Sequence, residues 1–150
     1  MNLALEMLNN FRYTSKIYER SFSEIRKKYD MTQLEVDILA FLKNNPHMDT
    51  ASDIVRYRML PKANVSQGVE LLIQKEMLVR RTDPCDRRRV HLELQKEAEP
   101  VLEGILEAQR SFGEILFRGI PEDEREWYLE MSHRISENIQ DGLENGKNGK

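Results

Sequence analysis

The feature that most constrains the fold is a change in the spacing of apolar residues near residue 76. In residues 61–75 apolar side chains recur every three or four positions, as they do on one face of a helix. From Met77 the pattern changes: "MLVRRT" is rich in residues that favour strands, and in "RVHLEL" apolar and polar residues alternate. The turn signal Asp83-Pro84 separates the two stretches. This pattern predicts a two-stranded antiparallel hairpin with a loop of about five residues, "DPCDR". Because a lone hairpin is marginal in water, it must pack on the helices before it.

Two short helices are predicted immediately before the hairpin. The first begins near Thr50 and runs through "ASDIVRYR"; the second covers residues 61–75, with Pro61 suited to a first helical turn. Two short helices with a tight turn between them form a helix-turn-helix, and the hairpin that follows makes the prediction a winged helix. The helical part alone is also compatible with an ordinary hairpin of two helices in a bundle.

Longer helices are predicted on both sides of this region. Residues 3–29 read as one helix with an apolar stripe long enough to need a covering helix. A helix follows the possible capping box of Thr32 and Glu35, and two more cover about residues 96–118, starting near Pro100, and 122–142. The predicted fold class is therefore mainly α with a small β-hairpin. It is a single chain, residues 1–150, with a winged helix-turn-helix core at 32–98, helical regions at 1–29 and 99–143, and a flexible tail at 144–150.

Charge is unevenly distributed along the sequence. The chain has a net charge of −3, yet residues 55–92 hold 9 basic and 4 acidic side chains. Residues 93–150 hold 7 basic and 14 acidic side chains, so the basic middle is followed by an acidic arm. A local basic region of this kind indicates an anionic partner, although clustering on a solvated surface gives the same count.

Two basic or polar surfaces in the middle of the chain have the chemistry to contact DNA. The hairpin tip carries Arg87 and Arg88, whose planar guanidinium groups suit phosphates or the narrow minor groove. We expect Asp86 to orient one of them through a salt bridge. The apolar face of helix 61–75 leaves an outer face whose first two turns are small or polar, and these side chains could reach base edges or phosphates. They are Lys62, Ala63, Asn64, Ser66 and Gln67.

These residues carry a resemblance to a known family. Residues of about 32–98 resemble the DNA-binding core of the MarR family of bacterial transcription regulators, through "NVSQGVELLIQKE" and the wing "LVRRTDPCDRRRVHLEL". The specific part is Asp83-Pro84, one residue, Asp86, then Arg88 and an alternating strand that ends at Leu94. The chain departs from the family at Glu76, where a glycine usually stands, and at Gln95, where a threonine usually caps the next helix.

The resemblance implies a homodimer joined by its N- and C-terminal helices, with helix 61–75 in the major groove and Arg88 in the minor groove of double-stranded DNA. Its site would be palindromic, with half-sites about one DNA turn apart. We expect Arg56, Arg58 and Lys75 to contact phosphates, and we expect a repressor, with small-molecule control by an unidentified effector left open. The alternative is a helical interaction module whose basic hairpin binds an acidic protein partner.

Other kinds of chemistry have little support in the sequence. It contains no glycine-rich phosphate loop and no nucleophile elbow, and its three histidines are widely spaced, so we expect no enzyme, no cofactor and no metal site. No apolar run approaches the ~20 residues of a membrane span, and with one cysteine a reducing cytoplasm is the expected compartment. Cys85, at the wing tip, is a candidate redox residue or an inert exposed thiol. Tyr13, Tyr18 and Trp127 could line a ligand cavity, although aromatic residues on helices more often pack.

Overall fold

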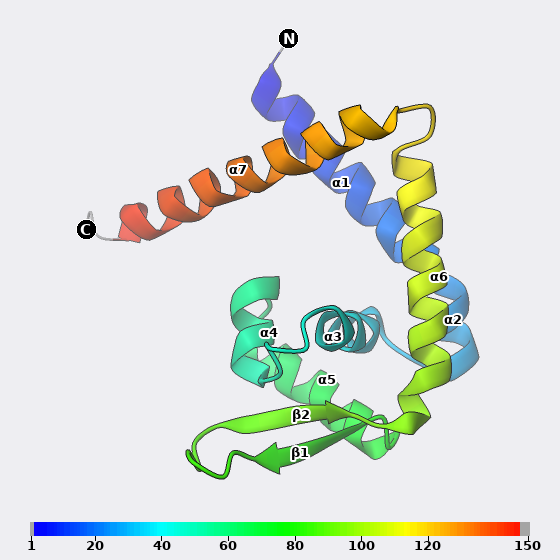
Figure 1. Cartoon of the computed structure of the whole chain (residues 1–150), viewed down its shortest axis with the longest axis vertical. Coiled ribbons are helices and arrows are strands. Elements are labelled where there is room, and N and C mark those ends of the chain that lie inside the picture. The colour runs from blue at the N-terminus through cyan, green and yellow to red at the C-terminus, as the bar shows by residue number, and fades with distance from the viewer. Residues whose placement is uncertain (1, 148–150) are drawn as a thin grey trace. The chain divides into compact units, whose positions relative to one another are not determined.

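The computed structural model describes residues 2–147 and divides the chain into two compact units, residues 1–112 and residues 113–150. The elements are α1 (Leu3–Ser21), α2 (Ser23–Tyr29), α3 (Gln33–Asn44), α4 (Ala51–Arg58), α5 (Lys62–Gln74), β1 (Leu78–Thr82), β2 (Val90–Leu94), the 3₁₀ turn η1 (Lys96–Ala98), α6 (Glu99–Leu116) and α7 (Glu122–Lys147). The described chain is therefore mainly helical with one two-stranded sheet, as predicted (Figure 1). Helix α6 starts one residue before Pro100, which lies in its first turn.

The hairpin is antiparallel, with Leu78 opposite Leu94 and Thr82 opposite Val90. Leu78 and Leu92 are buried while Val79 and Arg81 are exposed, so one face of the hairpin packs on the helices and the other faces out. The loop between the strands holds seven residues, 83–89, rather than the expected five. Arg89 ends this loop instead of starting the second strand, because its N–H donates to the carbonyl of Asp86 within a turn.

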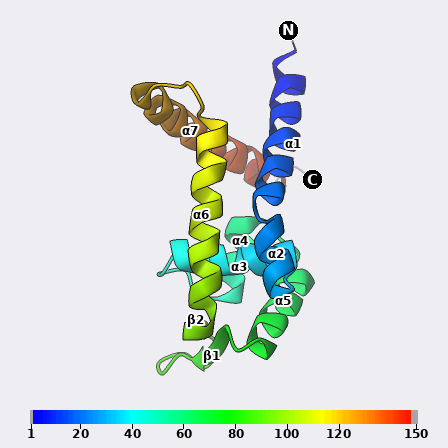
Figure 2. The ribbon, with the colours of Figure 1, turned by 90° about the vertical axis from the view of Figure 1, so that its right-hand side faces the viewer.

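The first unit is built around one apolar core. Its buried side chains come from helices α3, α4, α5 and α6, from both strands, and from the connecting residues Phe22, Met31, Met77 and Ala98. The expected capping box of Thr32 and Glu35 is present at the start of α3, and Thr50 and Asp53 form a second capping box at the start of α4. In Figure 2 α2 runs beside α6, and Gly104 of α6 lets Ile25 of α2 approach closely.

The helix expected over residues 3–29 is interrupted at Phe22. The side chain of Phe22 is fully buried and packs on Tyr18, and its N–H donates to the carbonyl of Glu19 at the end of α1. The interruption divides the apolar stripe into two parts with different surroundings. Tyr18, Phe22, Ile25 and Tyr29 pack on the core of their own chain, whereas Leu3, Met7 and Phe11 are exposed.

The second unit is dominated by α7, which begins at Glu122 after a turn at Gly119. Phe117 stacks edge-on against Tyr128, and the guanidinium of Arg125 lies over the Phe117 ring. Several large apolar side chains of α7 are exposed: Trp127, Leu129, Ile139 and Leu143. The helix continues through Lys147, into the segment 144–150 that we expected to be a tail, and residues 148–150 lie outside the described part.

Candidate nucleic-acid interface

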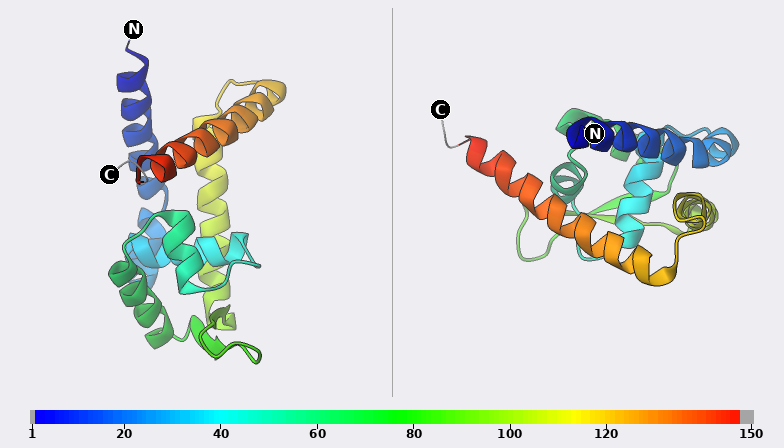
Figure 3. Two further views of the ribbon diagram at one scale, coloured as in Figure 1. Left: turned by 90° about the vertical axis from the view of Figure 1, so that its left-hand side faces the viewer. Right: turned by 90° about the horizontal axis from the view of Figure 1, so that it is seen from above.

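Helix α5 and the hairpin loop lie at one end of the first unit, and the start of α1 lies at the other end (Figures 1 and 3). All five residues predicted on the outer face of α5 are exposed: Lys62, Ala63, Asn64, Ser66 and Gln67. No side chain caps the first N–H groups of α5, which begins after Pro61, so this end of the helix keeps its partial positive charge. The exposed face of α5 therefore combines short polar side chains with a helix end that attracts anions.

The orientation of α5 is set by a close contact with α3. A Cβ atom on Gly68 would lie 2.6 Å from Cδ1 of Ile38 and 3.2 Å from Cγ of Leu34. Val65, Val69 and Leu72 are buried on the same side of α5. The glycine thus allows the two helices to pack closely and turns the polar face of α5 outward.

The hairpin loop, residues 83–89, is held by carboxylates that bind its own backbone. Oδ1 of Asp83 accepts the N–H groups of Cys85 at 2.8 Å and Asp86 at 3.0 Å, and Oδ1 of Asp86 accepts the N–H of Arg88 at 3.0 Å. The expected salt bridge from Asp86 to Arg87 or Arg88 is therefore wrong, because that carboxylate is used on the backbone. Within residues 2–147, Arg87, Arg88 and Arg89 are exposed and take part in no ion pair.

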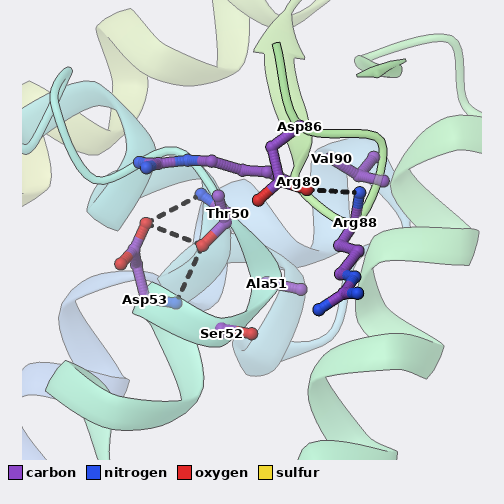
Figure 4. Close-up of a pocket in the computed structure, with 8 residues that line it drawn as sticks. All are labelled: Thr50, Ala51, Ser52, Asp53, Asp86, Arg88, Arg89 and Val90. Atoms are coloured by element: carbon purple, nitrogen blue, oxygen red, sulfur yellow. Dashed lines mark hydrogen bonds between the residues drawn. The ribbon is translucent and has the colours of Figure 1, made fainter. Parts of the chain in front are cut away.

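The loop faces the start of α4 across an open pocket of about 490 Å³ (Figure 4). Its lining comes from Thr50, Ala51, Ser52 and Asp53 at the start of α4, and from Asp86, Arg88, Arg89 and Val90 of the hairpin. Figure 4 shows the side chains of Arg88 and Arg89 leaving the loop in different directions, while Thr50 and Asp53 bond to one another. Two guanidinium groups are thus available for contacts outside this pocket as well as in it.

The arginines of the strands are engaged elsewhere. Arg80 lies 2.6 Å from Glu70 of α5, and Arg81 lies 2.7 Å from Glu93 of β2. The Arg80 pair neutralises the first acidic side chain on the outer face of α5 and joins the hairpin to that helix. These pairs explain why a sequence with five arginines between residues 80 and 89 presents only the last three as unpaired charges.

The three expected phosphate contacts have different surroundings. Arg56 is exposed, beside the ring of Tyr57. Arg58 lies 3.5 Å from Asp37. The ammonium of Lys75 lies 2.8 Å from the carboxylate of Glu35, which is only 1% exposed, and it also donates to the carbonyl of Asp30. Lys75 therefore holds α5 against α3, and its expected contact with a phosphate stays a prediction that competes with this ion pair.

A histidine at the base of the hairpin makes contacts that the sequence did not indicate. Nδ1 of His91 lies 2.7 Å from Asp49, in the loop before α4, and Nε2 lies 2.8 Å from Asp83. The hydrogen bond with Asp83, followed by that with Asp49, raises the pKa of His91 above its ordinary value, and the same bond with His91 helps lower the pKa of Asp83 to about 2. The alternation of β2 placed His91 on the polar face, but no local pattern identifies Asp49 as its neighbour.

A second pocket, of about 310 Å³, contains one of the aromatic residues expected to line a ligand cavity. It is lined by Tyr18, Asp37, Ala40, Phe41, Asn44, Asn45, Tyr57, Arg58 and Gln109. Burial, and next the negative charge of Asp37, raises the pKa of Tyr18 to about 12, while burial raises the pKa of Asp37. Tyr13, also expected there, is exposed and not among the lining residues.

Residues 2–147 contain neither a metal-holding group of side chains nor a membrane-spanning helix. No group of three or more His, Cys, Asp or Glu side chains there is arranged to hold a metal ion. None of the helices in this range is long and apolar enough to cross a membrane. Cys85 is a free, exposed thiol at the tip of the hairpin, and its redox role stays a prediction.

The fold is similar to that of known MarR-family proteins. The MarR family model matches residues 29–89, from the end of α2 to the end of the hairpin loop. The structure of a MarR protein from Peptoclostridium difficile is similar with a TM-score of 0.80 and 18% identity, over 95% of this chain and 92% of that one. A MarR-family transcriptional regulator from Silicibacter pomeroyi gives 0.77 and 17%, over 91% and 90%. BpsR of Bordetella bronchiseptica, whose DNA binding is regulated by 6-hydroxynicotinic acid, gives 0.72 and 18%, over 91% and 94%.

Proposed function

We propose that this chain, a member of the MarR family of DNA-binding transcription regulators, acts as a homodimer that binds a palindromic site in double-stranded DNA. In this proposal α5 enters the major groove and the hairpin loop reaches the adjacent minor groove. Lys62, Ala63, Asn64, Ser66 and Gln67 face the bases or phosphates of the major groove, and Arg87 and Arg88 enter or flank the minor groove. Arg56 contacts a phosphate, and Arg58 can do so only in competition with Asp37.

The observation that carries the proposal is the position of two DNA-compatible surfaces at one end of the first unit. The polar, uncapped start of α5 and the loop with three unpaired arginines lie at the end away from the start of α1. The acidic residues nearest to them, Glu70, Asp83 and Asp86, are each bound by a partner within the chain. This end therefore presents positive charge to a polyanion although the whole chain is acidic.

Dimerisation is supported by exposed apolar side chains on two separate helices. In α1, Leu3, Leu5, Leu8 and Phe11 are each more than half exposed, and α7 exposes Trp127 and Leu129 to a similar extent. Exposed apolar stripes of this length are typical of surfaces that a second helix covers. Sedimentation equilibrium should give twice the monomer mass of 17.7 kDa, and Phe11→Glu should weaken the dimer.

The wing can be tested with Arg88→Ala against DNA from upstream of the chain's own gene. Loss of one groove or phosphate contact should weaken binding in a gel-shift assay by about 1–3 kcal/mol, with an unchanged dimer mass. Arg110→Ala, an exposed arginine on α6 outside both DNA-facing surfaces, is the matched control and should bind as the parent does. Equal affinities of the two variants would remove the wing from the mechanism.

Salt dependence separates DNA binding from the alternative of an acidic protein partner. Release of counterions from duplex DNA makes log affinity fall linearly with log salt, with a slope of about −0.9 for each phosphate neutralised. We expect a steep slope for the dimer and a shallower slope for Arg88→Ala. A chain that binds no duplex DNA at low salt would refute the proposal.

We extend the proposal to repression with small-molecule control. The pocket beside Tyr18, Asp37 and Arg58 gives the first unit a polar cavity with an aromatic wall. The regulation of BpsR by 6-hydroxynicotinic acid makes small aromatic acids a reasonable first set for a thermal-shift screen. A compound that raises the melting temperature should also release DNA in the gel-shift assay and raise expression of a reporter gene. A screen in which stabilising compounds leave DNA binding unchanged would argue against this extension.

A further inference from the structure

The imidazole of His91 joins two loops that flank the proposed DNA surface. It lies on β2, with Nδ1 2.7 Å from Asp49 in the loop before α4 and Nε2 2.8 Å from Asp83 at the start of the hairpin loop. The backbone reinforces this junction, since Thr50 forms a β-bridge with His91 and the N–H of Leu92 donates to the carbonyl of Asp49 at 2.7 Å. The side chain of His91 is 16% exposed, so protons can still exchange with solvent.

From Asp83 the hydrogen bonds continue to the arginines of the hairpin loop. The oxygen of Asp83 that does not face His91 accepts the N–H groups of Cys85 and Asp86, and the side chain of Asp86 accepts the N–H of Arg88. The position of Arg88 relative to α4 therefore depends on which way the carboxylate of Asp83 is held. His91 is the side chain that connects this carboxylate to the rest of the first unit.

We propose that His91 is a positioning residue for the wing: its doubly protonated imidazole ties the hairpin loop to the start of α4, and DNA affinity falls when the imidazole loses a proton. This inference rests on the proposed DNA binding and adds a control by pH to it. A neutral imidazole carries one N–H, so it can donate to only one of the two carboxylates, and the other then faces a lone pair.

The charges around His91 favour the protonated state. Asp83 and Asp49 approach it from the hairpin loop and from the loop before α4. Arg81 is opposite it across the sheet but is paired with Glu93, and Asp53 of α4 is bound to Thr50. The hydrogen bonds with the two carboxylates raise the pKa of His91 above 6.5. The protonated link is therefore favoured below pH 6.5 and is lost as the pH rises through the raised pKa of His91. On the acid side it persists until the carboxylates are protonated, which for Asp83 occurs near pH 2.

An NMR titration of the full chain tests, without DNA, whether His91 links Asp83 of the hairpin loop to Asp49 before α4. The imidazole signals of the three histidines are assigned by single His→Gln variants and followed from pH 5 to pH 9. We expect His91 to titrate above 6.5, and the amide signals of Cys85, Asp86 and Arg88 to shift with the same midpoint. Asp49→Asn should lower that midpoint because it removes one carboxylate and leaves the hairpin loop untouched. The inference would be overturned by a titration midpoint for His91 at or below 6.5. It would also be overturned if the amide signals of Cys85, Asp86 and Arg88 did not shift with that midpoint.

The second measurement is DNA affinity against pH at constant salt. For the parent chain we expect roughly a tenfold loss of DNA affinity across the His91 titration, which is the lower end of the effect expected when one hydrogen bond between charged groups is lost. His91→Gln should show no such loss of affinity with pH, and at pH 6 it should bind DNA as weakly as the parent does at high pH. Asp49→Asn should move the loss of affinity to lower pH. The matched control is His47→Gln, because His47 is an exposed histidine in the loop that also holds Asp49. This variant should keep the pH profile of the parent. If His91→Gln keeps the parent profile, the inference fails and DNA binding stands. If no variant binds DNA at any pH, the proposed function fails, and the NMR titration still decides the role of His91.

Discussion

Replacing Lys75 with methionine tests whether this residue supports the fold or contacts DNA. Methionine keeps most of the apolar stem but removes the ammonium that lies 2.8 Å from Glu35. The carboxylate of Glu35 is 1% exposed, and its other oxygen accepts the N–H of Thr32 at 2.7 Å. The substitution therefore leaves a buried charge with one hydrogen bond where it had two partners.

The size of the effect follows from this burial. Removing one partner of a fully buried ion pair costs about 3–5 kcal/mol. Since the side chain of Lys75 is 27% exposed, water can partly solvate the exposed side of the pair. We therefore expect Lys75→Met to lower the free energy of unfolding by about 2–3 kcal/mol, which corresponds to a fall in Tm of about 5–10 °C for a chain of this size.

Chemical denaturation at one fixed protein concentration is the assay, because the stability of the proposed dimer depends on concentration. Lys62→Met, the same substitution at the other end of α5, is the control and should cost less than about 0.5 kcal/mol. Adding Glu35→Gln to Lys75→Met should recover about 1 kcal/mol, since it removes the uncompensated charge. The reasoning is refuted if Lys75→Met costs no more than Lys62→Met, or if it flattens the salt dependence of DNA binding by a full phosphate contact.

Two further substitutions test backbone and packing features of α5 and its end. Glu76 is exposed and has φ = 59°, in the left-handed region. Glu76→Gly should therefore raise the free energy of unfolding by about 0.5–1 kcal/mol, after the greater entropy of an unfolded glycine is subtracted. A destabilised variant would contradict the strain at this residue. Gly68→Ala should cost about 1–2 kcal/mol, because the clash with Ile38 exceeds the gain in helix propensity. Gly113→Ala in α6 should instead be stabilising, because a Cβ there has no neighbouring atom within 4 Å. Denaturation curves that give both variants the same change in stability would show that α3 and α5 pack less closely than the structure indicates.

The sequence was most informative where local pattern determines structure. The alternation around Asp83-Pro84 predicted the hairpin and its buried face, because period-2 spacing fixes which side chains share a face. The capping box at Thr32 and the cap residue Thr50 predicted two helix starts, since a cap is a contact between residues three positions apart. Exposure of the outer face of α5 also followed from the apolar residues on its other face.

The structure differs from the sequence-based predictions where contacts between residues far apart in the chain determine the conformation. The break at Phe22 depends on burial of its ring in a core formed by later helices, so a continuous apolar stripe could not reveal it. The partners of Lys75 and His91 lie 40 and 42 residues away in the sequence, at Glu35 and Asp49. The sequence shows that Lys75 is basic, but the packing of α5 on α3 determines which way its side chain points.

The backbone hydrogen bonds of the hairpin loop have a consequence for how a regulator of the proposed kind can diverge. Asp83 and Asp86 hold the loop through main-chain N–H groups, and the guanidinium groups at 87–89 contribute no bond to that frame within the described residues. The shape of the loop and the identity of its tip are thus encoded separately. Under the proposed function, a lineage can exchange residues 87–89, and with them the preferred DNA site, while the backbone of the loop stays unchanged.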